Sequence, residues 1–209
     1  NAGIADGGAL DWTELHVWRR VMEVNFFSVV SVTRSLLKFL KKTPGSRIIN
    51  VSSLAGILTT PGAGAYSASK HAVEGFAKAA REELRPWNIH VCNINPGFMR
   101  TPLLASGISA SQKTFNEAPT EITSEYTQDF IQEFNKVMNE TSEDPVKVVD
   151  TIVEAVFDKY PAFSYFPGNA ASILRAFPIA NSYVHDFYNT TLGSRIIPKP
   201  TPEAIKKYR

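Results

Sequence analysis

Long helical stretches alternate with short apolar runs along this chain, and that alternation limits the fold more than any other feature. Apolar spacing predicts helices over residues 10–42 and 66–85, and each is followed by a short apolar run, at residues 47–51 and 89–94. Parallel strands that are buried on both faces have such near-continuous apolar sequences. The order helix, strand, helix, strand therefore predicts an α/β fold with a doubly wound parallel sheet.

The rest of the chain is less regular. Residues 98–145 are polar and rich in Ser and Thr at first, and a helix is expected at residues 124–137. A further helix at residues 145–160 and a short strand at residues 163–166 are expected, and the tail beyond them carries aromatic side chains. Side chains along the first helix recur at helical spacing and predict one packed face, made of Val17, Val21, Val24, Phe27, Ser28, Val32, Leu36 and Phe39.

Composition indicates an ordinary globular chain. Its 209 residues are 44% hydrophobic and 20% charged, which predicts a single domain with a real core. The net charge of +2 is too small to favour nucleic acid as a partner. The single cysteine, Cys92, excludes a disulfide framework and a cluster of thiolate metal ligands, and we expect it to be a small core residue of a strand. No metal site is expected.

Tyr66 and Lys70 are the central candidate residues. They are four positions apart and share one face of the second helix. A free tyrosine has a pKa of about 10, and a neighbouring ammonium group stabilises the phenolate and lowers that pKa. Such a pair can exchange a proton with a substrate oxygen. The spacing alone is common, so the alternative is a solvated pair on a helix surface.

Polar residues also follow both predicted strands. Ser53 comes just after residues 47–51, at the end of a strand where open α/β sheets bind ligands, and its hydroxyl can hold a carbonyl or alkoxide oxygen. We expect the adjacent Ser52 to satisfy loop backbone. Pro96-Gly97 closes the second strand and Thr101 follows, so this turn either presents backbone and a hydroxyl to a cofactor amide or is an ordinary strand exit.

Asn25 lies inside the first predicted helix, between Val24 and Phe26, although Asn is a poor helix former. A polar amide at this place needs a partner. It either satisfies nearby backbone groups or anchors a chain of water that leads to Lys70.

These segments together resemble the short-chain dehydrogenase/reductase family. Several of its motifs occur in order and at proper intervals, which makes the resemblance specific over about residues 1–104. The resemblance implies a Rossmann-like sheet that lacks its first βαβ units in this chain, because the glycine-rich turn after the first strand is absent, and so an N-terminally truncated member. The matching segments are Asn1-Ala2-Gly3, Asn25, Val51-Ser52-Ser53, Tyr66 with Lys70, and Pro96-Gly97 with Thr101.

The resemblance implies a role for each matching position. Tyr66 would be the general acid and base, and Ser53 would hold the substrate oxygen. Lys70 would bind the nicotinamide ribose and lower the pKa of Tyr66, while Asn25 would hold a water in the proton relay. The implied cofactor is NAD or NADP, and its implied contacts are Asn1, Ala2, Gly3, Tyr66, Lys70, Pro96, Gly97 and Thr101.

The likeness is thinner beyond residue 104, where segments 160–161 and 165–170 are similar to the branch that contains retinol and hydroxysteroid dehydrogenases. It implies hydride transfer on a lipophilic alcohol or ketone such as a retinoid or steroid. The apolar side chains Phe98, Met99, Leu103 and Leu104 would then line the substrate, or they are simply core. We expect one domain, residues 1–209, with residues 98–145 as substrate loop and helices and residues 160–209 as a substrate-side extension.

The resemblance also implies expectations for the full-length protein. We expect a homo-oligomer located in the cytoplasm or at the endoplasmic reticulum, with membrane association through an upstream N-terminus. We also expect the present chain alone to bind cofactor poorly. The alternative function is a truncated or catalytically silent scaffold or binding protein of the same fold, against which the intact set of Asn25, Ser53, Tyr66 and Lys70 argues.

Overall fold

A parallel sheet lies at the centre of the computed structural model, which describes residues 2–59, 61–127, 129–169 and 201–207. Its strands are β1 (Arg47–Val51), β2 (His90–Ile94) and β3 (Ser164–Tyr165), in the order β1-β2-β3. Strands β1 and β2 pair without offset along their whole length. The predicted parallel α/β arrangement is therefore confirmed.

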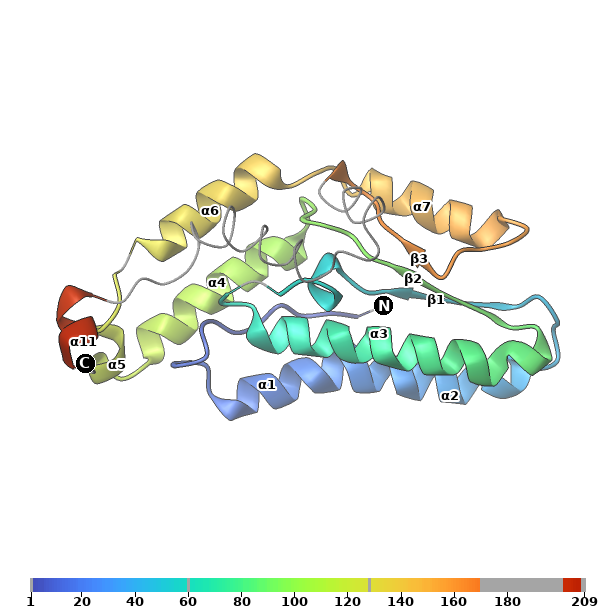
Figure 1. Ribbon diagram of the computed structural model, residues 1–209, viewed down its shortest axis with the longest axis horizontal. Helices are drawn as coiled ribbons and strands as arrows, with labels where there is room; N and C mark the ends of the chain where they lie inside the picture. The colour runs from blue at the N-terminus through green and yellow to red at the C-terminus, as the bar shows by residue number, and fades with distance from the viewer. Residues whose placement is uncertain (1, 60, 128, 170–200, 208–209) are drawn as a thin grey trace.

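Helices cover both faces of this sheet (Figure 1). Helices α2 (Ser28–Leu40) and α3 (Gly64–Leu84) pack on one face, and α7 (Val146–Phe157) packs on the other. Successive side chains of a strand point to opposite faces, so β2 supplies both cores. The α3 side is built from Ala77, Ala80, Leu84, Ile89 and Val91, and the α7 side from Cys92, Ile94, Ala155 and Tyr165.

The first predicted helix is interrupted, and the interruption corrects its predicted packed face. Helix α1 (Leu15–Met22) passes through a π-helical turn at Glu23–Phe27 before α2 begins. One extra residue rotates the following helix by about 100° relative to an uninterrupted one. The core contacts therefore move on by one position, to Leu37 and Leu40. The predicted face is exposed instead from the last residue of the turn onward, at Phe27, Val32, Leu36 and Phe39.

The segment after β2 is more helical than its composition predicts. Helix α4 (Pro102–Glu117) was not predicted. The helix expected at residues 124–137 begins later, as α6 (Phe130–Thr141), and the short α5 (Thr120–Thr123) precedes it. Proline in its first turn favours the start of α4. Long-range packing supports both longer helices through a cluster of Phe98, Leu104, Ile108, Phe134 and Val137.

Some predictions lie outside the described residues. These are Asn1 and the aromatic tail over residues 170–200, so the proposed C-terminal extension is described only at residues 160–169 and 201–207, where α11 (Pro202–Lys207) lies. Within the described part of the chain, no helix combines the length and apolar character needed to cross a membrane.

Ile94 tests the packing of α7 on the sheet. Its side chain is fully buried with Ala155 and Tyr165, so Ile94→Ala should lower the free energy of unfolding by about 2–5 kcal/mol. Leu10→Ala is a matched control because that side chain is 80% exposed, and its cost should stay within about 0.5 kcal/mol. Urea unfolding followed by circular dichroism measures both, and equal losses would contradict the described core.

Candidate active site

The carboxyl ends of β1 and β2 meet at one edge of the sheet, called here the carboxyl edge. Two backbone hydrogen bonds continue the pairing past the strands, from Ser52 N to Ile94 O and from Leu54 N to Pro96 O, each 2.8 Å long. The Ser53 hydroxyl accepts a hydrogen bond from Ala55 N at 3.1 Å and so caps a short 3₁₀ turn, Leu54–Gly56. The predicted substrate-side serine is thereby held at the edge where α/β sheets bind ligands.

Tyr66 lies in the first turn of α3 and meets Ser53. The two hydroxyl groups form a side-chain hydrogen bond, which lowers the pKa of Tyr66. Burial is the larger effect and raises that pKa above its usual value of 10.0, so the prediction of a lowered pKa for Tyr66 is wrong for the protein without cofactor. The phenol is therefore protonated at neutral pH, which makes it a proton donor within reach of the Ser53 hydroxyl.

Lys70 follows one turn later and points back to the sheet. Its ammonium group donates a hydrogen bond to Val51 O at 3.1 Å and lies 5.6 Å from the centre of the Tyr66 ring. Burial lowers the pKa of Lys70 to about 8, while the negative charge of Glu74 acts in the opposite direction. Lys70 is therefore a buried cation beside the phenol rather than part of a solvated helix surface.

A glycine lets the turn after Ser53 rest on α3. A Cβ atom built on Gly56 would lie 2.9 Å from Lys70 O and 3.1 Å from the Glu74 side chain. Backbone cannot move out of the way as a flexible side-chain end can. Glycine at this position therefore allows the Ser53 segment to approach the helix that carries Tyr66 and Lys70.

Asn25 occupies the π-helical turn and is fully engaged. Its side-chain Oδ1 accepts from Ile4 N at 2.9 Å, and its Nδ2 donates to Ile4 O at 2.9 Å and to the Ser69 hydroxyl at 3.0 Å. The backbone that it satisfies is therefore 21 positions away rather than nearby. Gly3 lies beside it, with its missing Cβ position 3.6 Å from the Asn25 oxygen.

Three further buried residues belong to this region and were not predicted. Ser69 donates to Tyr66 O at 2.7 Å and accepts from Asn25, so it links α3 to the π-helical turn. Glu74 is a buried acid one turn beyond Lys70. Asn95 follows β2 and is fully buried. The helical spacing of Ser69 from Tyr66 and of Glu74 from Lys70 could have indicated the first two. Asn95 could have been found as a polar residue directly after an apolar strand.

The remaining predicted positions line the exit from β2. Phe98 packs in the cluster between α4 and α6, as does Leu104, and Met99 is buried. Thr101 precedes α4, and its hydroxyl donates to Met99 O at 3.4 Å. Leu103 is partly buried on α4. Phe98 and Leu104 thus have a packing role.

Ser52 differs from its prediction. Its hydroxyl is buried and has no hydrogen-bond partner in the part of the chain that the structure describes, so it does not satisfy the backbone of its own loop. Among the described residues, no group of three or more His, Cys, Asp or Glu side chains is placed so that it could hold a metal ion. The polar groups at the carboxyl edge are hydroxyl, amide and ammonium groups, which suit an organic ligand better than a metal ion.

Comparison with known proteins identifies the relatives of this chain. The sequence model of the family described as short chain dehydrogenase matches residues 1–112. Over 155 residues the chain is 35% identical to the uncharacterized oxidoreductase YusZ of Bacillus subtilis, a match that covers 74% of this chain and 54% of that protein. Over 101 residues it is 41% identical to the 3-ketodihydrosphingosine reductase of Bacteroides thetaiotaomicron, covering 48% and 38%. The chain spans about half the length of the relatives it matches, or less.

A solved structure shows the same fold. An actinorhodin polyketide ketoreductase variant, solved with NADPH, superposes with a TM-score of 0.60 at 28% sequence identity. The match covers 79% of this chain and 63% of that one.

Asn25 tests the link between the π-helical turn and the segment that begins the chain. Asn25→Ala removes three hydrogen bonds and leaves both backbone groups of Ile4 without their partner. We expect the free energy of unfolding to fall by about 1–3 kcal/mol, measured by urea titration. Asn116→Ala, which removes an exposed hydrogen bond to Gln112, should change it by no more than about 0.5 kcal/mol. A loss no larger than that of the control would show that these bonds do not hold the turn.

Proposed function

Because the chain belongs to the short-chain dehydrogenase family, we propose that the full-length protein is an NAD(P)-dependent oxidoreductase that interconverts an alcohol and a ketone or aldehyde. The observation that carries this proposal is the hydrogen bond between Tyr66 and Ser53 beside the buried Lys70 ammonium. The three groups meet at the carboxyl edge of a parallel sheet, where such folds bind nucleotide cofactors.

The polar groups at this edge fit a nicotinamide nucleotide. An ammonium group has three donors, and Lys70 gives one of them to Val51 O, so donors are left for ribose hydroxyls. The Ser52 hydroxyl and the Asn95 side-chain amide directly follow β1 and β2, and both are buried without a hydrogen-bond partner among the described residues. We assign cofactor contacts to Lys70 and Tyr66, and to the segments Ala2-Gly3, Pro96-Gly97 and Thr101. The related ketoreductase solved with NADPH supports this class of cofactor.

When bound, the nicotinamide supplies or accepts the hydride, and the chain supplies the proton. In the direction of reduction, the substrate carbonyl oxygen accepts a hydrogen bond from Ser53 and receives the phenolic proton of Tyr66 as its carbon gains the hydride. Burial keeps Tyr66 protonated for this step. In the direction of oxidation, the Ser53 hydroxyl and the Lys70 charge stabilise the phenolate that takes the proton back.

The side chain of Asn25 has a structural role in this proposal and does not itself contact the water of the proton relay. Both of its amide protons are already donated, to Ile4 O and to Ser69, and its oxygen accepts from Ile4 N. We therefore assign any contact with a water of the proton relay to its backbone carbonyl. The side chain fixes the π-helical turn that presents this carbonyl.

The proposed substrate is lipophilic, such as a retinoid or steroid. Met99 and Leu103 lie at the exit of β2, close in sequence to the proposed cofactor turn; Leu103 is only partly buried and offers apolar surface, whereas Met99 is buried. The relative that is named 3-ketodihydrosphingosine reductase supports a lipid-like substrate. Phe98 is proposed as a partial lining residue, because it packs against Val137 and is only partly buried.

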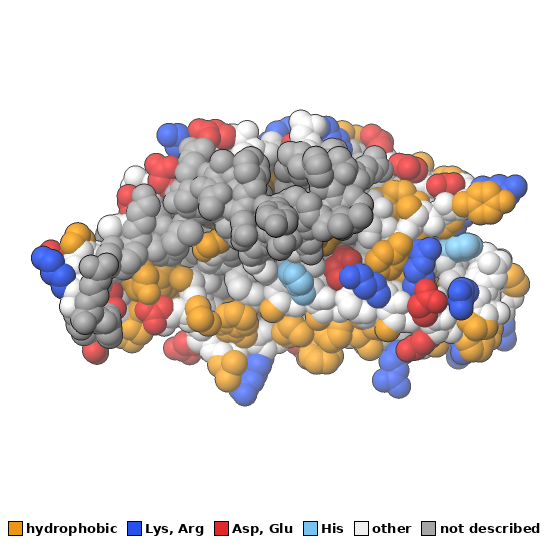
Figure 2. All heavy atoms as spheres, viewed as in Figure 1, with side chains coloured by type: hydrophobic (Ala, Val, Ile, Leu, Met, Phe, Trp, Pro, Cys, Tyr) orange, Lys and Arg blue, Asp and Glu red, His pale blue; other side chains and the backbone are white. Residues whose placement is uncertain are grey.

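We also propose that the protein forms a homo-oligomer. Figure 2 shows hydrophobic side chains along the lower side of the view, over α1 and α2. Phe27, Val32, Leu36 and Phe39 are each about half exposed there. Apolar side chains grouped on one helix face commonly mark a protein contact.

Tyr66→Phe tests the assigned proton donor. Removing the hydroxyl should lower kcat by about 10²–10⁴-fold, measured as nicotinamide absorbance change against a panel of retinoids, steroids and short hydroxy acids. Cofactor affinity, measured by nicotinamide fluorescence, should stay within about threefold because the ring remains. Tyr160→Phe, at a residue that is 77% exposed, is the control and should leave both unchanged. Near wild-type turnover in Tyr66→Phe would remove Tyr66 from the reaction.

The pH profile tests the buried ammonium. Because burial lowers the pKa of Lys70 to about 8, the group loses its charge as pH rises through that value. We expect kcat/KM, which reports the free enzyme, to fall above about pH 8. Lys78→Met removes an exposed lysine from the same helix and should keep this profile. A plateau that extends to about pH 10, where ordinary lysines titrate, would contradict the assignment.

A further inference from the structure

The two ends of the helical segment 101–142 are joined side by side. Met99 and Glu143 form a parallel bridge, with hydrogen bonds from Glu143 N to Phe98 O at 2.9 Å and from Arg100 N to Glu143 O at 2.8 Å. The Arg100 guanidinium also donates to Ser142 O at 2.7 Å. We call these paired residues, 98–100 and 142–143, the neck. Helices α4, α5 and α6 extend beyond it, away from the sheet (Figure 1).

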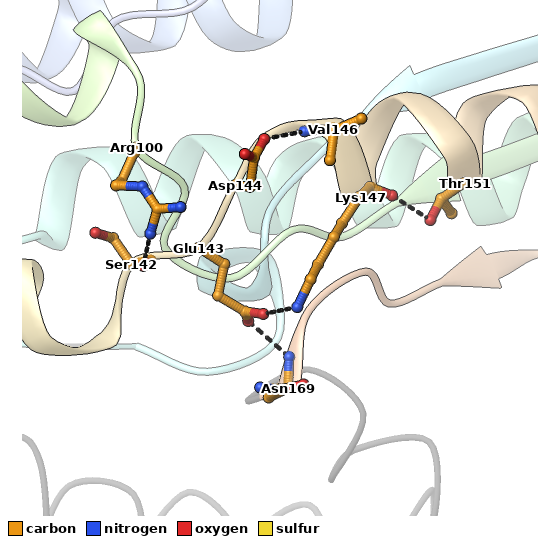
Figure 3. Close-up of polar contacts among 8 residues, drawn as sticks. All are labelled: Arg100, Ser142, Glu143, Asp144, Val146, Lys147, Thr151 and Asn169. Carbon is orange, nitrogen blue, oxygen red and sulfur yellow. Dashed lines mark hydrogen bonds and ion pairs between the residues drawn. The ribbon is translucent and has the colours of Figure 1, made fainter.

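The side chain of Glu143 ties the neck to two other parts of the fold (Figure 3). One carboxylate oxygen accepts a hydrogen bond from Asn169 N at 2.6 Å, in the turn that follows β3. The other oxygen pairs with Lys147 in the first turns of α7. The Glu143 side chain is only 16% exposed. Glu143 therefore joins the exit of β2 through its backbone, and the start of α7 and the end of β3 through its carboxylate.

Gly168 shows how closely the chain approaches this carboxylate. Its φ of +91° lies in the region that favours glycine. A Cβ atom there would lie 2.5 Å from a Glu143 carboxylate oxygen and 3.1 Å from the end of the Met99 side chain. A larger residue would displace both, so the contact depends on glycine.

The surroundings keep Glu143 ionised. The hydrogen bond from Lys147 is the largest cause of a lowered pKa of Glu143, and the Asn169 amide and the charge of Arg100 act in the same direction. Burial raises the pKa, with an effect smaller than that of the Lys147 hydrogen bond but larger than those of the Asn169 amide and of Arg100. Charge-assisted hydrogen bonds are about twice as strong as neutral ones, so the carboxylate fastens the neck more firmly than a neutral amide would.

The neighbouring acid makes no such connection. Asp144 lies two positions before the start of α7 and accepts a hydrogen bond from Val146 N, in the first turn of that helix, at 2.9 Å. It is exposed, and within the described part of the chain its side chain bonds Val146 rather than the neck or residues 168–169. Asp144→Asn therefore removes the same charge, one position away, without touching the connection.

We infer that Glu143 is a positioning residue that holds the neck, and with it the Phe98–Thr101 segment, against the body of the fold so that substrate can bind. This inference rests on the proposed function, which assigns Phe98, Met99 and Thr101 to the substrate and the cofactor. Loosening the neck should weaken substrate binding more than it slows the chemical step, because Tyr66 and Ser53 are held by other elements.

The test compares Glu143→Gln, Gly168→Ala and Asp144→Asn in the full-length protein. For the first two we expect the substrate KM to rise about tenfold with kcat within about threefold of wild type. Hydrogen exchange of the Arg100, Glu143 and Asn169 amides should become faster in the same two variants. Asp144→Asn should leave KM and the exchange of these amides unchanged.

Three results would overturn the inference. Unchanged exchange in Glu143→Gln would show that the carboxylate does not hold the neck. Faster exchange with unchanged KM would show a structural contact with no part in substrate binding. Equal effects in Asp144→Asn would show that only charge near α7 matters. If wild-type protein shows no nicotinamide-dependent turnover, the proposed function and the positioning role both fail, and the exchange measurement still decides whether Glu143 holds the neck.

Discussion

The unshifted parallel pairing of β1 with β2 is the constraint on which the candidate site depends. Because Asn50 faces Asn93 and Val51 faces Ile94, both strands end at the same level, and the Ser53 turn and the Pro96 turn leave side by side. The hydrogen bond between the Asn50 and Asn93 side chains, 3.0 Å long, supports this register inside the fold. A shift by one residue would turn Asn50 away from Asn93 and move the two exits apart.

Burial shifts the pKa values of the two ionisable groups at this edge in opposite directions. It raises the pKa of Tyr66 and lowers that of Lys70, so each group is pushed toward its neutral form. Hydrogen bonds and nearby charge act against this: Ser53 bonds the phenol, and Glu74 favours the ammonium. The site therefore combines a protonated phenol with a cation that is still largely charged at neutral pH, which is the state that donating a proton requires.

Sequence patterns predicted the elements and residues whose structure depends on neighbouring positions in the chain. Strand β1 and helix α3 follow from apolar periodicity, and Tyr66, Lys70 and Ser53 could be proposed from motif order. Helix α4 escaped prediction because its support is distant: Phe115 packs against Trp12 with ring centres 5.1 Å apart. The rotated face of α2 was not predicted because it depends on the π-helical turn. That turn contains Asn25, which bonds a residue 21 positions earlier in the chain. The Glu143 contact depends on Asn169, 26 positions away, which no short-range pattern reports.

Transfer of a labelled hydride tests the central claim most directly. The full-length protein would be incubated with nicotinamide cofactor deuterated at the transferred position and with lipophilic ketones and aldehydes, and the alcohols analysed by mass spectrometry. The account predicts one deuterium on the carbinol carbon of the product. Cofactor binding without any deuterium in an alcohol, across the whole set of carbonyl compounds, would contradict it.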